Sequence, residues 1–210
     1  MLNDLKKKVV EIAKRADNEG LCKHKSGNFS IRDHETGYIL ITPSAVAREV
    51  LKEEDIAVVD IEGNIIELKS DVKPSSELKV HLVAYKQRDD VFGVCHTHSH
   101  YATAFAVQGL EIKPVVFEAV AYGVRTPIAK YGRPGTQELA NSIIEPLKES
   151  DACLLEKHGV ITVGKDLEDA YLKAQYVEDV AEIAYCSMVI GGGKLPEAIP
   201  QEEFDAVMHP

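Results

Sequence analysis

The chain has 210 residues, of which 45% are hydrophobic and 28% are charged, and its formal net charge is −10. This length and balance are typical of one folded domain with its own core, so we expect residues 1–210 to form a single domain. The 34 acidic against 24 basic residues disfavour a nucleic-acid partner, because contact with phosphate backbones needs clustered Lys and Arg. No apolar run reaches the roughly 18 residues that span a bilayer, so we expect no membrane partner either.

The N-terminus and the cysteines indicate a cytoplasmic protein. Residues 3–20 place Leu5, Val9 and Ile12 on one face of an amphipathic helix, which is not the pattern of a signal peptide. The four cysteines lie far apart and form no CxxC pair, which favours small buried hydrophobic side chains over disulfides.

Strands and helices are predicted along the rest of the chain. The pattern predicts strands, in chain order, at 28–32, 38–42, 57–60, 65–68, 91–95, 113–117, 151–156 and 159–163. It predicts helices at 77–87, 101–107, 136–148 and 167–189, with Ser99 capping the second and Pro146 ending or kinking the third. Hairpins mixed with helices indicate a layered α/β or α+β domain with a largely antiparallel sheet.

A pair of histidines at the end of a predicted strand suggests a metal site. His96 and His98 are two residues apart, so both side chains leave one face of the strand and can chelate one ion. His158 stands between two strands and before Gly159, where the backbone can approach a site closely, and is the best third ligand. Three histidines with an open position are the arrangement of a catalytic zinc ion. A helix starting near Ser99 would leave His100 outside the ligand set.

Glu77, at the start of a predicted helix, allows two interpretations. It is either a first-turn acid that pairs with the helix dipole, or a metal ligand and general base. Pro74-Ser75-Ser76 precedes it, and a helix start of this kind binds anions. The segments at 27–30 and 42–44 are similarly rich in hydroxyl and amide donors, and could bind a phosphate only if the fold brings them together.

Five short motifs, taken together, resemble a known family. They are, in order, SGNFS at 26–30, TPS at 42–44, SSE at 75–77, HTH at 96–98 and KHG at 157–159. Their order and spacing resemble the class II aldolase/adducin head family, most closely its fuculose-phosphate aldolase branch. The resemblance runs from the first helix to the long helix that ends near Ile190.

The resemblance implies a fold and a set of site residues. The fold would be an α/β/α three-layer sandwich around a largely antiparallel central sheet, assembled as a homotetramer with active sites between subunits. One Zn²⁺ per subunit would be held by His96, His98, His158 and, without substrate, by Glu77, which would also be the catalytic acid–base residue. The residues lining the substrate phosphate pocket would be Gly27, Asn28, Ser44, Ala45, Ser75 and Ser76.

The resemblance also implies an activity. The chain would be a metal-dependent carbon–carbon lyase, cleaving a ketose 1-phosphate similar to L-fuculose 1-phosphate into dihydroxyacetone phosphate and a small aldehyde such as lactaldehyde. In that branch a tyrosine that reaches a neighbouring subunit's site protonates the aldehyde oxygen, and Glu118 stands at its position here. Ala45 stands where glycine is usual. The Glu118 difference leaves the aldehyde half of the substrate open.

Other branches of the same family are the alternatives. An L-ribulose-5-phosphate 4-epimerase usually has Asp at the position of Glu77, so the SSE triplet favours the aldolase. A methylthioribulose-phosphate dehydratase is a further alternative. A non-catalytic adducin-type interaction domain would not need the three histidines.

Overall fold

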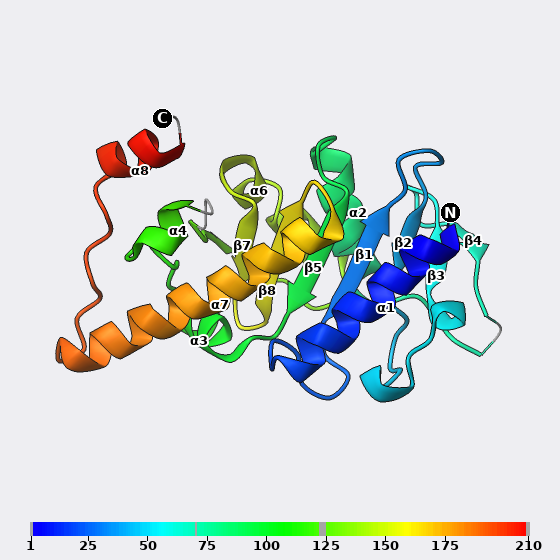
Figure 1. Cartoon of the computed structure of the whole chain (residues 1–210), viewed down its shortest axis with the longest axis horizontal. Helices are drawn as coiled ribbons and strands as arrows, with labels where there is room; N and C mark the ends of the chain where they lie inside the picture. Colours follow the sequence, from blue (N-terminus) through cyan, green and yellow to red (C-terminus); the bar gives the residue numbers. More distant parts are fainter. Residues whose placement is uncertain (1, 70, 122–124, 209–210) are drawn as a thin grey trace.

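A computed structural model describes residues 2–69, 71–121 and 125–208 of the chain, and an eight-stranded sheet forms its centre (Figure 1). The strand order is β4-β3-β2-β1-β5-β8-β7-β6. Neighbouring strands pair antiparallel, except for β6 and β7, which are parallel. The strands are β1 (Asn28–Arg32), β2 (Ile39–Ile41), β3 (Ala57–Val59), β4 (Ile65–Glu67), β5 (Gly93–Thr97), β6 (Ile128–Ala129), β7 (Ala152–Leu155) and β8 (Gly159–Gly164). The prediction of an α/β domain with a largely antiparallel sheet is confirmed.

Helices cover both faces of this sheet. The α-helices are α1 (Leu2–Asn18), α2 (Leu78–Gln87), α3 (His100–Gln108), α4 (Phe117–Ala121), α5 (Gln137–Ser142), α6 (Pro146–Glu149), α7 (Leu167–Ile190) and α8 (Gln201–Met208). Two short 3₁₀ helices are η1 (Arg48–Val50) and η2 (Glu53–Asp55). The helices α1 and α7 run across one face, and α2 lies on the other (Figure 1).

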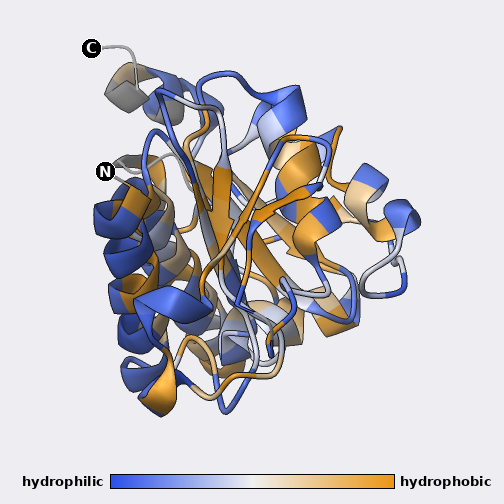
Figure 2. Ribbon diagram, turned by 90° about the vertical axis from the view of Figure 1, so that its right-hand side faces the viewer, coloured by the Kyte–Doolittle hydropathy of each residue, from blue (hydrophilic) through white to orange (hydrophobic). Residues whose placement is uncertain are grey.

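The alternation of side chains along the strands builds a core on each face. Leu40 of β2 packs in the cluster that includes α1, whereas its neighbour Ile39 packs in the cluster that includes α2. Cys95 and Val94 of β5 divide in the same way. Strands that are apolar on both faces are therefore enclosed between layers of helices, and the hydrophobic strands lie at the centre of the molecule (Figure 2). His96 leaves β5 on the α2 side, opposite to Cys95, as the two-residue period requires.

Two predicted elements differ from the structure. Residues 113–117 form no strand: only an isolated bridge joins Ile112 to Thr126, and α4 begins at Phe117. Pro114 lacks the N–H that a strand ladder needs, which explains why pairing stops there. The predicted helix at 136–148 is two helices, α5 and α6, with Pro146 at the first turn of the second, so the break expected at this proline is confirmed.

Three of the four cysteines match the expectation of small buried side chains. Cys22, Cys95 and Cys153 are buried free thiols, and Cys186 is an exposed one. Among the helices in the described parts of the chain, none combines the length and the apolar composition that a membrane crossing requires.

Ala45 has an unfavourable backbone conformation in the loop after β2. Its φ is +61°, in the left-handed region that glycine adopts readily and other residues avoid. Ala47, two residues later, has φ −68° and ψ 144°, an ordinary extended conformation. The same loop therefore holds one strained and one unstrained alanine.

We expect Ala45→Gly to stabilise the protein and Ala47→Gly to destabilise it. The first change removes a left-handed strain of roughly 1–2 kcal/mol, which exceeds the unfolded-state entropy of about 0.4–1 kcal/mol that either change adds, while the second adds that entropy alone. Urea unfolding of the two variants and the wild type measures both shifts. A loss of stability in Ala45→Gly as large as that in Ala47→Gly would contradict the strain at position 45.

Candidate active site

One carboxylate and three imidazoles meet at the end of β5. The ligand atoms of Glu77, His96, His98 and His158 all lie within 4.8 Å of one another, and the group could hold a metal ion. The Nε2 atoms of His96 and His98 are 3.0 Å apart. Glu77 Oε2 is 3.1 Å from His96 Nε2, and Glu77 Oε1 is 3.2 Å from His158 Nε2. The structure thus brings together the four residues that the sequence predicted as ligands.

The sheet register brings the histidines together. Strand β5 includes His96 and ends at Thr97, so His98 follows directly, and β8 begins at Gly159, directly after His158. A Cβ atom at Gly159 would lie 2.3 Å from the Thr97 carbonyl oxygen and 3.1 Å from the His98 ring, so only glycine lets the two strands approach here. The close approach expected at this glycine is confirmed.

Backbone details outside the sheet also fit the site. Lys157, before His158, has a left-handed backbone with φ +59°, a strained conformation of the kind that concentrates at functional sites. Ser99 stands at the N-cap of α3, as predicted, but its side chain makes no capping hydrogen bond. The carboxylate of Glu178 on α7 accepts from the backbone N–H groups of Tyr101 and Ala102 instead. His100 begins α3 and is exposed, which leaves it outside the cluster.

The ionisation states of the cluster residues favour the binding of a cation. Burial lowers the pKa of His98 to about 3 and that of His158 to about 4, with the neighbouring His96 adding to both shifts, so these two imidazoles are neutral and offer lone pairs. Burial alone would raise the pKa of the Glu77 carboxyl, but His96, His158 and Asn28 outweigh it and hold the pKa below its usual range. Burial opposes the proton on His96, yet Glu77 raises the pKa of that ring above its ordinary value.

The donor set fits a divalent metal ion such as zinc. The ring Nδ1 of His96 lies 2.8 Å from the Val160 carbonyl and donates to it, so the neutral ring turns the Nε2 lone pair toward the cluster, where a cation would take the place of the proton that Glu77 favours. Glu77 Oε1 is buried without a hydrogen-bond partner. Lone pairs that face one another at about 3 Å repel unless a positive charge lies among them, and three imidazoles with a carboxylate are typical zinc ligands.

Three donor-rich loops converge beside this cluster. The Ser44 hydroxyl donates to the Pro74 carbonyl at 3.0 Å and accepts from the Ser76 N–H at 2.9 Å. Thr42 joins the loop at 42–44 to β1, because its hydroxyl accepts from the Phe29 N–H at 3.1 Å. The convergence that the sequence could not establish is therefore present, and it brings the segments at 27–30, 42–44 and 74–76 together.

Positions 27 and 28 connect the loops to the cluster. Gly27 has φ +73°, and a Cβ atom there would lie 2.2 Å from the Cys22 sulfur and 2.8 Å from the His96 carbonyl oxygen. Asn28 is paired with His96 across β1 and β5. Its side-chain amide donates to Glu77 Oε2 at 3.0 Å, so Asn28 contacts the carboxylate as well as the predicted phosphate loops.

Sequence reasoning missed two buried polar residues near the site. Arg48 is 2% exposed and donates to the Gly27 carbonyl at 2.6 Å and to the Ser26 carbonyl at 3.2 Å, so its cation lies against the first loop. His81 is fully buried and contacts Asn28. Its position, one helical turn after Glu77 and among the buried apolar residues of α2, is the signal that could have revealed it; nothing in the sequence marks Arg48.

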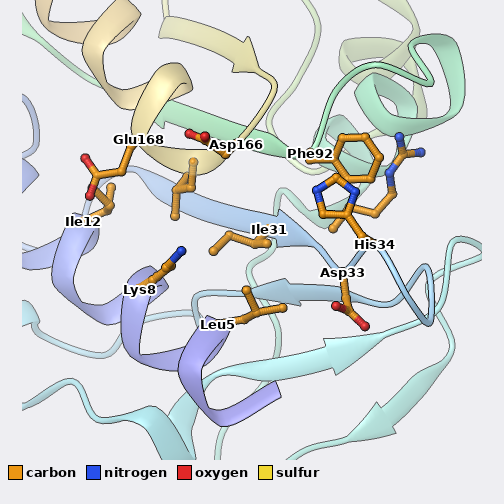
Figure 3. A pocket seen from close by; sticks show the side chains of 11 residues that line it. Leu5, Lys8, Ile12, Ile31, Asp33, His34, Phe92, Asp166 and Glu168 are labelled. Atoms are coloured by element: carbon orange, nitrogen blue, oxygen red, sulfur yellow. The ribbon is translucent and has the colours of Figure 1, made fainter. Parts of the chain in front are cut away.

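A separate cavity lies between α1 and the sheet. It has a volume of about 170 Å³, and Figure 3 shows its lining, which includes Leu5, Ile12, Ile31, His34 and Phe92. None of its lining residues belongs to the Glu/His cluster or to the three loops. It is therefore a different feature from the candidate active site.

Glu118 stands at the position of the tyrosine of the fuculose-phosphate aldolase branch. It is distant in sequence from the loops at 27–30, 42–44 and 74–76. It is exposed in the first turn of α4, a helix that packs against α7 and α8.

Comparison with known proteins identifies the family. The profile of the Class II Aldolase and Adducin N-terminal domain matches residues 7–185. A 5-deoxy-D-ribulose 1-phosphate aldolase of Bacillus thuringiensis serovar kurstaki is 33% identical over 205 residues, which cover 98% of this chain and 94% of the relative. An L-fuculose phosphate aldolase of Methanococcus maripaludis is 39% identical over 159 residues, which cover 76% of this chain and 84% of the relative. A solved structure of an L-fuculose 1-phosphate aldolase superposes with a TM-score of 0.90 at 33% identity, covering 97% of this chain and 94% of the other.

The fold is that of a class II aldolase, and the chain belongs to the class II aldolase and adducin family. The resemblance noted from the five motifs is confirmed. The expectation of a carbon–carbon lyase of this family is also confirmed, because the relatives are aldolases.

We expect Gly159→Ala to impair metal uptake more than Gly164→Ala, although both crowd the backbone of β8. At Gly164 the new methyl group would meet the Ala170 nitrogen at 2.6 Å, far along the strand from the histidines, whereas at Gly159 it would also push against the rings of His96 and His98. Both variants should lose about 1–3 kcal/mol of stability, and only Gly159→Ala should lose about tenfold or more in metal affinity.

Thermal unfolding and metal content after dialysis measure the two effects separately. Equal metal retention in both glycine variants would show that the close approach at Gly159 does not shape the cluster.

Proposed function

We propose that this chain is a zinc-dependent class II aldolase that reversibly cleaves a ketose 1-phosphate into dihydroxyacetone phosphate and a small aldehyde. The observation that carries the proposal is the cluster of Glu77 and three histidines beside three convergent, donor-rich loops. The aldolases among its relatives support the reaction class.

The metal ligands are His96, His98 and His158, with Glu77 as a further ligand before substrate binds. The neutral state of His98 and His158 and the fixed tautomer of His96 support these roles. When bound, zinc supplies Lewis-acid stabilisation of the negative charge that develops on the substrate carbonyl, worth several kcal/mol.

Glu77 is the acid–base residue of the reaction. In cleavage, the Glu77 carboxylate takes up the proton of the C4 hydroxyl, the C3–C4 bond breaks with its electron pair left on C3 of the ketose, and the aldehyde leaves. Glu77 then delivers a proton to C3, which completes dihydroxyacetone phosphate, and it removes that proton in the reverse direction. Oε2 is held by Asn28 while the buried Oε1 has no hydrogen-bond partner, an arrangement that leaves one oxygen free to carry the proton.

The substrate phosphate lies in the pocket formed by the three loops. Its lining residues are Gly27, Asn28, Ser44, Ala45, Ser75 and Ser76. Ser75 and Ser76 precede the start of α2, where N–H groups and the helix dipole favour an anion. The buried cation of Arg48 behind Gly27 adds a positive charge to this side of the site.

The ketose is either a six-carbon L-fuculose 1-phosphate or a shorter 5-deoxy sugar. One relative is named for L-fuculose phosphate and another for 5-deoxy-D-ribulose 1-phosphate, and both substrates would give dihydroxyacetone phosphate. The aldehyde would be lactaldehyde from the first and acetaldehyde from the second. Glu118, in place of the tyrosine of the fuculose-phosphate aldolase branch, is the difference that bears on this choice.

A coupled assay for dihydroxyacetone phosphate tests the activity. We expect the zinc-loaded protein to release it from at least one of these two ketose 1-phosphates, and chelation of the metal to abolish the release. Appearance of xylulose 5-phosphate from L-ribulose 5-phosphate would instead establish an epimerase, and loss of water from methylthioribulose 1-phosphate a dehydratase. Bound metal without activity on any of these sugars would favour an adducin-type interaction domain.

We expect Glu77→Gln to retain zinc but lose most of its turnover. The amide oxygen can still accept the Asn28 hydrogen bond, and the three histidines remain, but glutamine cannot carry the proton; a loss of at least about 10²-fold in kcat is the scale of general acid–base catalysis. Steady-state kinetics together with zinc content provide the measurement. The exposed Glu62→Gln is the matched control. Cleavage at near wild-type rate by Glu77→Gln would refute the role.

We also propose that the protein is a cytoplasmic homotetramer with active sites between subunits. Exposed apolar side chains on α3 and α7 support an oligomer: Val107, Ile183, Tyr185, Val189 and Ile190 are 45–88% exposed. Sedimentation at several protein concentrations measures the subunit number.

A further inference from the structure

A continuous chain of hydrogen bonds leads from Glu77 into the core between α2 and the sheet. Asn28 Nδ2 lies 3.0 Å from Glu77 Oε2, and Asn28 Oδ1 lies 2.5 Å from His81 Nε2. Beyond the imidazole, His81 Nδ1 is 2.6 Å from the Ser30 hydroxyl, which is 2.8 Å from the hydroxyl of Tyr85. Two members come from β1, and Glu77, His81 and Tyr85 follow one another at four-residue intervals along one side of α2.

The direction of every hydrogen bond in this chain is determined. A carboxylate only accepts, so the Asn28 amide presents its NH₂ group to Glu77 and its carbonyl oxygen to His81. His81 must therefore donate from Nε2, and its neutral ring accepts at Nδ1 from the Ser30 hydroxyl. Ser30 in turn accepts from the Tyr85 O–H. All the donors thus point toward Glu77.

The chain is shielded from water along its whole length. Asn28 is 5% exposed, Tyr85 is 1% exposed, and Ser30 and His81 are fully buried. Burial lowers the pKa of His81 to about 3 and raises the pKa of Tyr85 well above its usual value, so the imidazole and the phenol are both uncharged. A buried network in which every member is satisfied holds one arrangement, because breaking any bond leaves a polar group without a partner.

We propose that His81 is a positioning residue for the active site, which acts by fixing the side-chain amide of Asn28 and, through it, the carboxylate of Glu77. The Nε2–H of His81 excludes the flipped orientation of the Asn28 amide. If this amide turned over, its NH₂ group would face the His81 N–H and its carbonyl oxygen would face Glu77 Oε2. Both contacts would be repulsive. His81 therefore keeps Oε2 engaged and directs Oε1 toward His158.

This inference rests on the proposed role of Glu77 and extends it to His81, which is linked to the carboxylate through Asn28. A purely structural role would be met by any side chain that fills the same volume. A positioning role requires a donor toward Asn28 and an acceptor toward Ser30. Glutamine can supply both groups, whereas leucine supplies neither, so the two substitutions separate the hypotheses.

The test compares His81→Leu, His81→Gln and Leu82→Ala in the zinc-loaded full chain. We expect kcat to fall roughly 10- to 100-fold in His81→Leu, the usual scale for a residue that orients a ligand, while KM changes by less than about threefold and zinc content is unchanged. His81→Gln should recover most of kcat. Leu82→Ala, a buried neighbour on α2 outside the hydrogen-bond chain, should lower thermal stability and leave kcat near wild type. A kcat for His81→Leu within about threefold of wild type, or no recovery in His81→Gln, would overturn the proposal.

A second measurement does not depend on catalysis. Nitrogen-15 chemical shifts of the His81 ring report which nitrogen carries the hydrogen, with or without metal. We expect the neutral Nε2–H form, and a ring protonated at Nδ1 alone would overturn the proposal even in an active enzyme. If wild type cleaves no ketose 1-phosphate, the proposed function fails, and the tautomer still decides whether the hydrogen-bond chain exists as described.

Discussion

The carboxylate of Glu77 is the charge around which this part of the molecule is arranged. It is 8% exposed, so it loses most of its hydration and must be compensated by neighbours. One oxygen accepts from Asn28, and both face histidine rings. The compensation comes from three directions: α2 supplies the carboxylate, β1 supplies the amide, and β5 with the turn before β8 supplies the rings. The sheet order β1-β5-β8 makes these segments adjacent, which is why the site requires this topology.

The loops and the hydrogen-bond chain have a common element in β1. Its first residue, Asn28, lies opposite His96, joins the Glu77 carboxylate and follows the glycine that passes close to Cys22. Phe29 is tied to Thr42 and so to the next loop, while Ser30 faces His81. Successive side chains of β1 point to opposite faces of the sheet. Phe29 therefore packs in the core on the α1 side, while Asn28 and Ser30 face the active-site side.

The sequence predicted this site well where local pattern and residue chemistry coincide. The two-residue spacing of His96 and His98 and the glycine after His158 sufficed to choose the three histidines, the family resemblance added Glu77, and Pro146 sufficed to divide a helix. Prediction failed at residues 113–117, where apolar β-branched residues resembled a strand but tertiary contacts leave only one bridge. Arg48 and His81 could not be given roles, because their partners are the backbone and an amide that only the folded chain brings near. Convergence of three loops is likewise a property of the tertiary structure.

The large separation of the ligands along the chain has a consequence for the order of folding. His98 and His158 are 60 positions apart, and Glu77 reaches the cluster from a helix on another layer. The long loops between the ligands must close before the contacts between their ends can form, so the ligands are not close together in the unfolded chain. An ion therefore meets its full set of ligands only after β5 and β8 have paired. Metal held by this cluster would therefore act on the native state alone: it would slow unfolding while leaving the rate of folding nearly unchanged. The bound ion would thus lengthen the lifetime of the folded state without making folding faster.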